Sequence, residues 1–80
     1  MLVVSERTII NINNVTHIES IDLPRTNQPV IRFFCNSICD NDENLVEIEF
    51  HDGQYRDEVF SLLPKAYKEG LKVFNVRESY

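Results

Sequence analysis

Four side chains of the types that bind zinc stand out in this chain of 80 residues: His17, Cys35, Cys39 and His51. Two cysteines and two histidines form a common structural zinc site, which would stabilise a domain this small. The three residues between Cys35 and Cys39 match a zinc knuckle, but we expect this stretch to be extended, so that it spans about 13 Å. Two ligands of one ion cannot lie so far apart. We therefore favour one core thiol and one loop thiol, and keep a zinc-stapled or thiol-regulatory protein as the alternative.

No arrangement of residues typical of an enzyme is found. Cys35 and His51 are expected on opposite faces of a sheet, which argues against a Cys–His nucleophile pair. The segment Asp40–Asn44 offers oxygen ligands at alternate positions, as the start of an EF-hand loop does, but Leu45 replaces the required glycine and His51 the terminal glutamate. The chain has only two glycines, too few for a Gly-rich phosphate loop. We predict no catalytic residues and no cofactor.

Charge and cysteine content limit the partners and the compartment. The formal net charge is -5, and the acidic residues concentrate between Asp40 and Glu58. The basic residues form no dense cluster, so nucleic acid and anionic membranes are not expected as partners. The segment Met1–Arg7 lacks the features of a signal peptide or an anchor. Two cysteines without such a signal favour a reducing cytoplasm.

The first half of the chain is rich in Ile, Val, Thr and Phe and is broken by Asn, Pro and Asp, as strands and turns are. This pattern predicts four strands: Thr8–Ile12, Val15–Leu23, Val30–Ile38 and Leu45–His51. In the second strand the apolar residues do not alternate strictly, which indicates a bulge or an irregular start.

The third and fourth predicted strands form the clearest hairpin. Matching their apolar residues places Phe33 opposite Phe50 and Cys35 opposite Ile48. This register leaves Arg32 on the outer face, near Glu49 and His51. A slip by one residue would bury Arg32 and Asn36 instead, at a cost in desolvation.

A helix is predicted after Asp52-Gly53, which can cap it, and Gly70 is expected to end it. Its apolar residues recur at the three- and four-residue spacing of one buried stripe: Tyr55, Val59, Leu62, Leu63, Ala66 and Tyr67. Pro64 interrupts the pattern, so we expect a kink or a restart near Leu63. Leu71–Val76 is predicted to be a last strand.

These elements predict an α+β fold in which an antiparallel sheet of about four to five strands packs against one helix in the C-terminal half. Residues 1–80 are expected to form a single compact domain. The element order resembles that of pleckstrin-homology-like rolls, which end in a helix packed over a bent antiparallel sheet. The resemblance implies that fold and no function.

The outer face of the predicted sheet carries apolar residues that need a cover. One alternative is that Leu2–Val4 or the last strand folds over them within the monomer. The other is a protein interface, formed by Arg32, Phe34, Ile38, Leu45, Glu47, Glu49 and His51. We expect a small non-enzymatic intracellular protein that acts through protein contacts, either as a homodimer or by docking to a larger partner.

Overall fold

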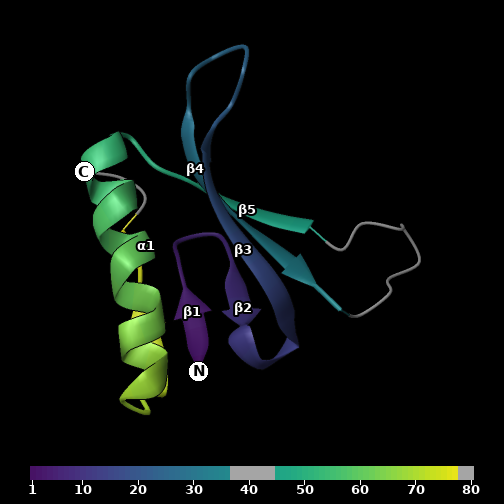
Figure 1. The fold of residues 1–80 in the computed structure, drawn as a ribbon, viewed down its shortest axis with the longest axis vertical. Helices are drawn as coiled ribbons and strands as arrows, with labels where there is room; N and C mark the ends of the chain where they lie inside the picture. Colours follow the sequence, from purple (N-terminus) through teal and green to yellow (C-terminus); the bar gives the residue numbers. More distant parts are fainter. Residues whose placement is uncertain (37–44, 78–80) are drawn as a thin grey trace.

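The computed structural model describes residues 1–36 and 45–77 and has an α+β fold with one long helix and two small sheets (Figure 1). In chain order the elements are β1 (Leu2–Val4), β2 (Ile9–Asn11), the 3-10 turn η1 (Ile12–Asn14), β3 (Val15–Asp22), β4 (Pro29–Cys35), β5 (Leu45–Glu49), α1 (Gly53–Lys68) and β6 (Val73–Asn75). The predicted single sheet of four to five strands was wrong, because the strands form two sheets of three, ordered β2-β1-β6 and β3-β4-β5. The pleckstrin-homology-like roll is not confirmed.

The sheet β2-β1-β6 joins the two ends of the described chain. β1 pairs antiparallel with β2 and parallel with β6. The turn between β1 and β2 is closed by Ser5, whose hydroxyl donates to the carbonyl of Thr8 and accepts from its N–H. Leu2–Val4 and the last strand therefore pair with each other, rather than cover the outer face of the β3-β4-β5 sheet.

The sheet β3-β4-β5 confirms which residues of the predicted hairpin share a face but corrects their register. Ile31, not Cys35, lies opposite Ile48, and Phe33 lies opposite Val46. The shift moves each pair by an even number of residues, so every side chain keeps its predicted face. β4 ends at Cys35, three residues earlier than predicted, which lengthens the connection to β5.

The helix α1 begins and ends where the sequence predicts. The Asp52 carboxylate accepts from the Tyr55 N–H at 3.0 Å, as an N-cap does. Gly70, with a φ of 79°, follows the last turn. The helix runs through Pro64 without interruption, so the expected restart at Leu63 was wrong. Among residues 1–36 and 45–77, no helix combines the length and hydrophobicity that crossing a membrane requires.

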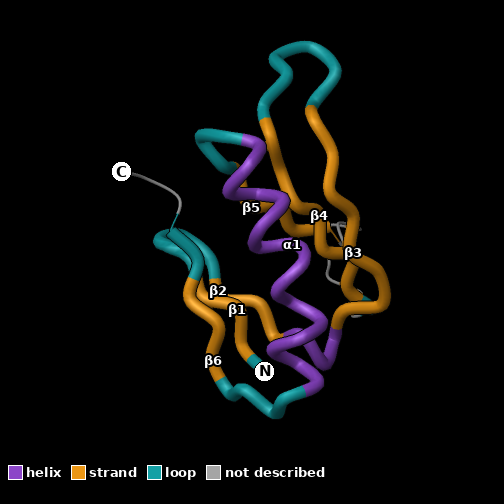
Figure 2. The backbone as a smooth tube through the Cα atoms, turned by 60° about the vertical axis from the view of Figure 1, so that its left-hand side comes forward, coloured by secondary structure: helices purple, strands orange, loops and turns teal. Residues whose placement is uncertain are grey.

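The core is formed by residues of the helix and of both sheets, whose arrangement around α1 is shown in Figure 2. Phe33 and Phe50 are its largest fully buried side chains, and each contributes about 1.5–3 kcal/mol through removal of apolar surface from water. The buried stripe of α1 is Arg56, Val59, Leu63 and Ala66. It is narrower than predicted, because Leu62 and Tyr67 are 39% and 57% exposed.

Candidate functional site

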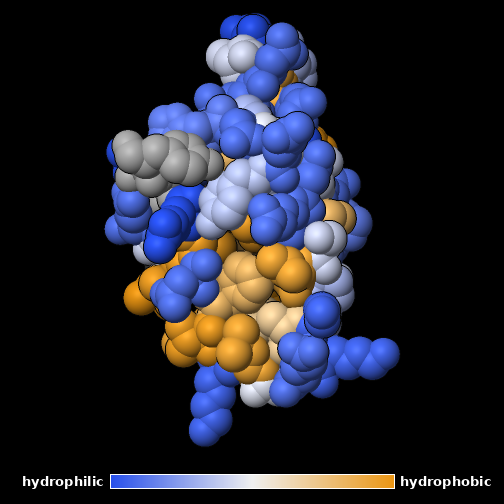
Figure 3. All heavy atoms as spheres, turned by 90° about the vertical axis from the view of Figure 1, so that its left-hand side faces the viewer, coloured by the Kyte–Doolittle hydropathy of each residue, from blue (hydrophilic) through white to orange (hydrophobic). Residues whose placement is uncertain are grey.

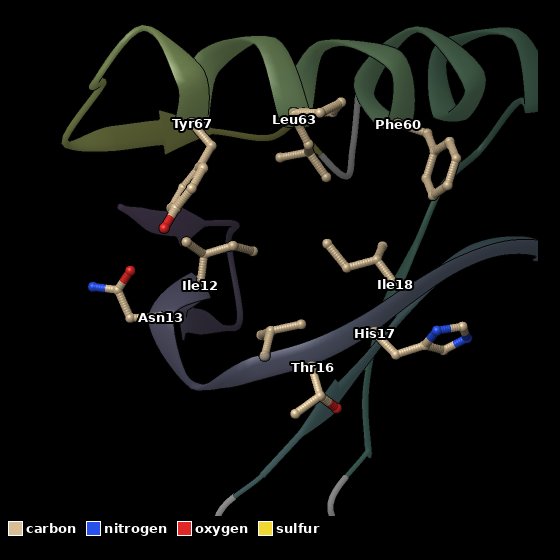
Figure 4. Close-up of a pocket in the computed structure, with 10 residues that line it drawn as sticks. Ile12, Asn13, Thr16, His17, Ile18, Phe60, Leu63 and Tyr67 are labelled. Atoms are coloured by element: carbon tan, nitrogen blue, oxygen red, sulfur yellow. The ribbon is translucent and has the colours of Figure 1, made fainter.

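An apolar groove of about 560 Å³ lies between β3 and the second half of α1 (Figure 4). In the close-up, the side chains of Phe60, Leu63 and Tyr67 come down from the helix toward Ile12 and Ile18 on the other wall. The complete lining is Ile12, Asn13, Val15, Thr16, His17, Ile18, Phe60, Leu63, Pro64 and Tyr67. The volume is within the range of ligand sites in proteins, about 300–1,000 Å³.

The strand wall of the groove depends on a bulge in β3. Before the bulge Val15 pairs with Cys35, and after it His17 pairs with Phe34, so that Thr16 is the extra residue. The extra residue turns both Val15 and Ile18 toward the helix, although regular alternation would place them on opposite faces. The irregular strand predicted from the sequence is thereby confirmed.

The helix wall consists of residues three and four apart on one side of α1. Phe60, Leu63, Pro64 and Tyr67 have this spacing, which places them above one another. Leu63 also belongs to the core, whereas Tyr67 is 57% exposed at the end of the groove. The Pro64 nitrogen carries no hydrogen, so the Phe60 carbonyl lacks its usual helical donor. This carbonyl is therefore a main-chain acceptor that the i to i+4 pattern of the helix does not satisfy.

Two polar residues of the lining, Thr16 and His17, lie on β3. The Thr16 hydroxyl donates to the Phe34 carbonyl at 3.1 Å. His17 stacks at a tilt on Phe34, with ring centroids 5.1 Å apart, and its Nε2 lies 3.1 Å from Oε2 of Glu19. These contacts hold His17 on the outer face of the sheet. Val15 and Ile18 form the strand wall of the groove.

The opposite end of the β3–α1 pair is held by Arg56. Its Nη1 donates to the Ile21 carbonyl at 2.7 Å and to Oδ1 of Asp22 at 2.6 Å, and its Nε donates to Oδ1 of Asp57 at 3.0 Å. Burial alone lowers the pKa of Arg56, but the hydrogen bonds and charges of Asp22 and Asp57 outweigh it and raise that pKa. The guanidinium is thus a permanent cation that fixes one end of the groove.

No family model, curated protein or solved structure matches this chain. What the groove can bind must therefore be inferred from the residues that line it. An apolar groove with a few polar groups at its rim is the kind of surface that ligand-binding sites have.

Six of the seven residues of the predicted interface lie among the described residues, and none of the six is buried. Arg32 pairs with Glu47 across the sheet, Nε to Oε2 at 2.6 Å, and not with Glu49 or His51 as the earlier register implied. Phe34 lies opposite Leu45, which is 38% exposed, and both are on the predicted outer face. The remaining predicted member, Ile38, lies outside the described residues.

The structure also places three of the four zinc-competent residues. His17 and Cys35 are on β3 and β4, and His51 follows β5. Cys39 and the acidic segment Asp40–Asn44 lie outside the described residues. Within residues 1–36 and 45–77, no group of three or more His, Cys, Asp or Glu side chains is placed to hold a metal ion.

A second apolar surface lies at the helix side of the molecule, where Figure 3 shows hydrophobic side chains gathered on the lower half of the view. Leu2 lies beside Val73 on the outer face of the β2-β1-β6 sheet, and the two are 38% and 43% exposed. Leu62 of α1 and Leu71 after it are exposed as well. No described segment covers these residues.

Sequence reasoning missed the groove, although two signals for it were present. The spacing of three between Val15 and Ile18 fits neither a regular strand nor a loop, and it marks the bulge. The predicted helical stripe contained more apolar residues than one face can bury. Tyr67 and Leu62 lie on opposite flanks of that stripe, and Tyr67 is the one that borders the groove.

Proposed function

We propose that this protein is a non-enzymatic binding module that holds an apolar segment of a partner protein in the groove between β3 and α1. The observation that carries the proposal is the groove itself, with walls formed by Val15 and Ile18 on one side and Phe60, Leu63 and Tyr67 on the other. Burying such side chains against a partner is the main source of favourable free energy in protein association.

The charge balance supports a protein partner. The chain has a formal net charge of -5 with eight basic residues, a poor basis for holding phosphate backbones. We propose that binding takes place in the cytoplasm, where the thiols of the two cysteines would stay reduced. A second copy of the chain is another possible occupant of an apolar surface, and light scattering coupled to size exclusion distinguishes it: a dimer that Tyr67→Ser dissociates would identify the occupant as the second copy.

The test is selection from a displayed library of random short peptides, with the purified chain as target. Tyr67→Ser shortens one wall of the groove without opening the core, because Tyr67 is 57% exposed. Leu62→Ser is the matched control: it also removes an exposed apolar side chain of α1, but about 140° around the helix from Tyr67. The proposal expects enriched peptides that Leu62→Ser retains and Tyr67→Ser loses. Absence of enrichment, or equal loss with both variants, would refute it.

A further inference from the structure

We infer that the segment held in the groove is an extended chain that joins the free edge of β3 as an added antiparallel strand, with a Lys or Arg between two apolar residues. This inference rests on the proposed function and deepens it, since it specifies the conformation and the chemistry of the partner segment.

Within residues 1–36 and 45–77, β3 is an edge strand, because it pairs with β4 on one side and with no strand on the other. Figure 4 shows α1 across the groove from β3, with the side chain of Ile18 pointing toward the helix. An edge strand presents a row of unpaired main-chain N–H and C=O groups, which can pair with another chain.

Main-chain hydrogen bonds at the ends of the strands show which groups of β3 point to that edge. Leu23 N–H donates to the Gln28 carbonyl, and Phe50 N–H donates to the Pro29 carbonyl. The main-chain N–H and C=O groups of Gln28, just before β4, and of every second residue after it therefore point to β3. The main-chain groups of the residues between them point to β5. Phe34, three steps along this series from Gln28, accepts from the Thr16 hydroxyl of β3, which agrees with this assignment.

The same alternation applies to β3. His17, Glu19 and Ile21 lie opposite residues whose groups point to β3, so they use their N–H and C=O groups in the ladder. Ile18 and Ser20 direct theirs to the free edge. An added strand can thus form four main-chain hydrogen bonds, two at each of these residues.

The two walls of the groove are equal in length. From Val15 to Ile18 the strand wall extends about 10 Å, and from Phe60 to Tyr67 the helix wall also extends about 10 Å. Three to four extended residues, at about 3.3 Å each, match this length. A helical segment would satisfy its own main-chain groups and leave the edge of β3 unused.

The faces of the sheet define the side chains of the added strand. Residues opposite Ile18 and Ser20 share the face that α1 covers. The residue opposite Ile18 lies at the groove, which Ile18 lines together with Phe60 and Leu63, and the residue opposite Ser20 lies beyond that lining. The residue between them shares the outer face with Glu19. A row of charges crosses that face, from Glu47 through Arg32 to Glu19, with Arg32 and Glu47 in contact. A Lys or Arg beside Glu19 continues the alternation of negative and positive charge, as opposite charges favour neighbouring strands.

The test uses the blocked peptide Thr-Val-Lys-Val-Thr and the 15N-labelled chain. Binding is expected to shift the amide resonances of Ile18 and Ser20 and to slow their exchange with solvent. N-methylation of either Val removes one bond to β3 and should weaken binding by roughly three- to tenfold. N-methylation of the Lys, whose N–H points away from β3, should leave the affinity unchanged.

Two further comparisons probe the chain and the charge. Ser20→Pro removes an edge N–H and should weaken binding, whereas Ser20→Ala keeps that N–H and should not. Replacing the Lys of the peptide by Glu should also weaken binding, because the carboxylate would face Glu19.

The outcomes separate this inference from the proposed function. Equal effects of N-methylation at Val and at Lys, equal binding by a peptide of the same composition with the apolar residues adjacent, or no binding by the alternating peptide would each overturn strand addition. The proposed function would survive these results if library peptides still require Tyr67. The proposed function fails as well if neither the alternating peptide nor any library peptide binds to the groove.

Discussion

The Nη1 atom of Arg56 lies 2.6 Å from Oδ1 of Asp22, and this contact joins the beginning of α1 to the end of β3. At the other end of the same two elements no ion pair joins the described residues, and the groove opens between Tyr67 and Ile12. The helix is thus held at one end and leaves room at the other.

Arg56→Met should destabilise the fold by about 2 kcal/mol, because the charged hydrogen bond from Arg56 to the Ile21 carbonyl is lost, while the exposed Asp22 and Asp57 are rehydrated. Arg56→Lys should cost less, since it keeps the charge. Urea unfolding measures both. The raised pKa of Arg56 means that its contribution is complete at neutral pH and is lost only as the pH rises through that pKa. A loss of folding stability between pH 6 and pH 9 that occurs in the unmodified chain and is absent from Arg56→Met would contradict this.

Phe33→Ala and Phe34→Ala test the faces of β4. Phe33 is fully buried in the core and Phe34 lies on the outer face beside His17. Removing the Phe33 ring should cost about 3–5 kcal/mol, and removing the Phe34 ring about 1 kcal/mol. Thermal or urea unfolding of the two variants gives the comparison. Equal losses of stability would mean that the faces are wrongly assigned.

Glu19→Pro and Ser20→Pro test the direction of the main-chain groups in β3. Glu19 uses its N–H in the ladder with Arg32, so proline there should cost about 3 kcal/mol or more. Ser20 directs its N–H to the free edge, and proline should be tolerated much better. The reverse order of stabilities in urea would place Glu19, and not Ser20, at the edge.

Pro64→Ala should stabilise the chain by about 1–2 kcal/mol, because alanine restores the bond to the Phe60 carbonyl, and the greater freedom of the unfolded chain offsets part of that gain. The same change removes an apolar ring from the groove. Peptide binding should therefore weaken while the melting temperature rises. Lower stability together with unchanged binding would show that Pro64 serves the helix and not the groove.

The sequence was most informative where local chemistry decides the structure. Asp52 caps α1 and Gly70 follows its end because a side-chain acceptor and a positive φ are local needs. Alternation along Leu45–Glu49 likewise fixed which residues face the core. The offset of the β4–β5 hairpin could not be predicted in the same way, because an even shift buries the same side chains.

The second sheet and the groove could not be predicted from the sequence, because both depend on contacts between segments far apart in the chain. β1 and β6 are three residues each and meet from opposite ends of the chain, and nothing in their periodicity distinguishes a separate sheet from an extension of the main one. The groove depends on the bulge at Thr16 and on Tyr67, two features that become a site only when α1 is placed beside β3.

The most direct test of the central claim is a set of intermolecular nuclear Overhauser effects between a library-selected peptide and the side chains of the chain. If the groove is the binding site, protons of the peptide will show these effects with Phe60, Leu63 and Tyr67 on α1 and with Ile18 on β3. Effects confined to Phe34 and Leu45, or to Leu2 and Val73, would place binding on another surface and contradict the account.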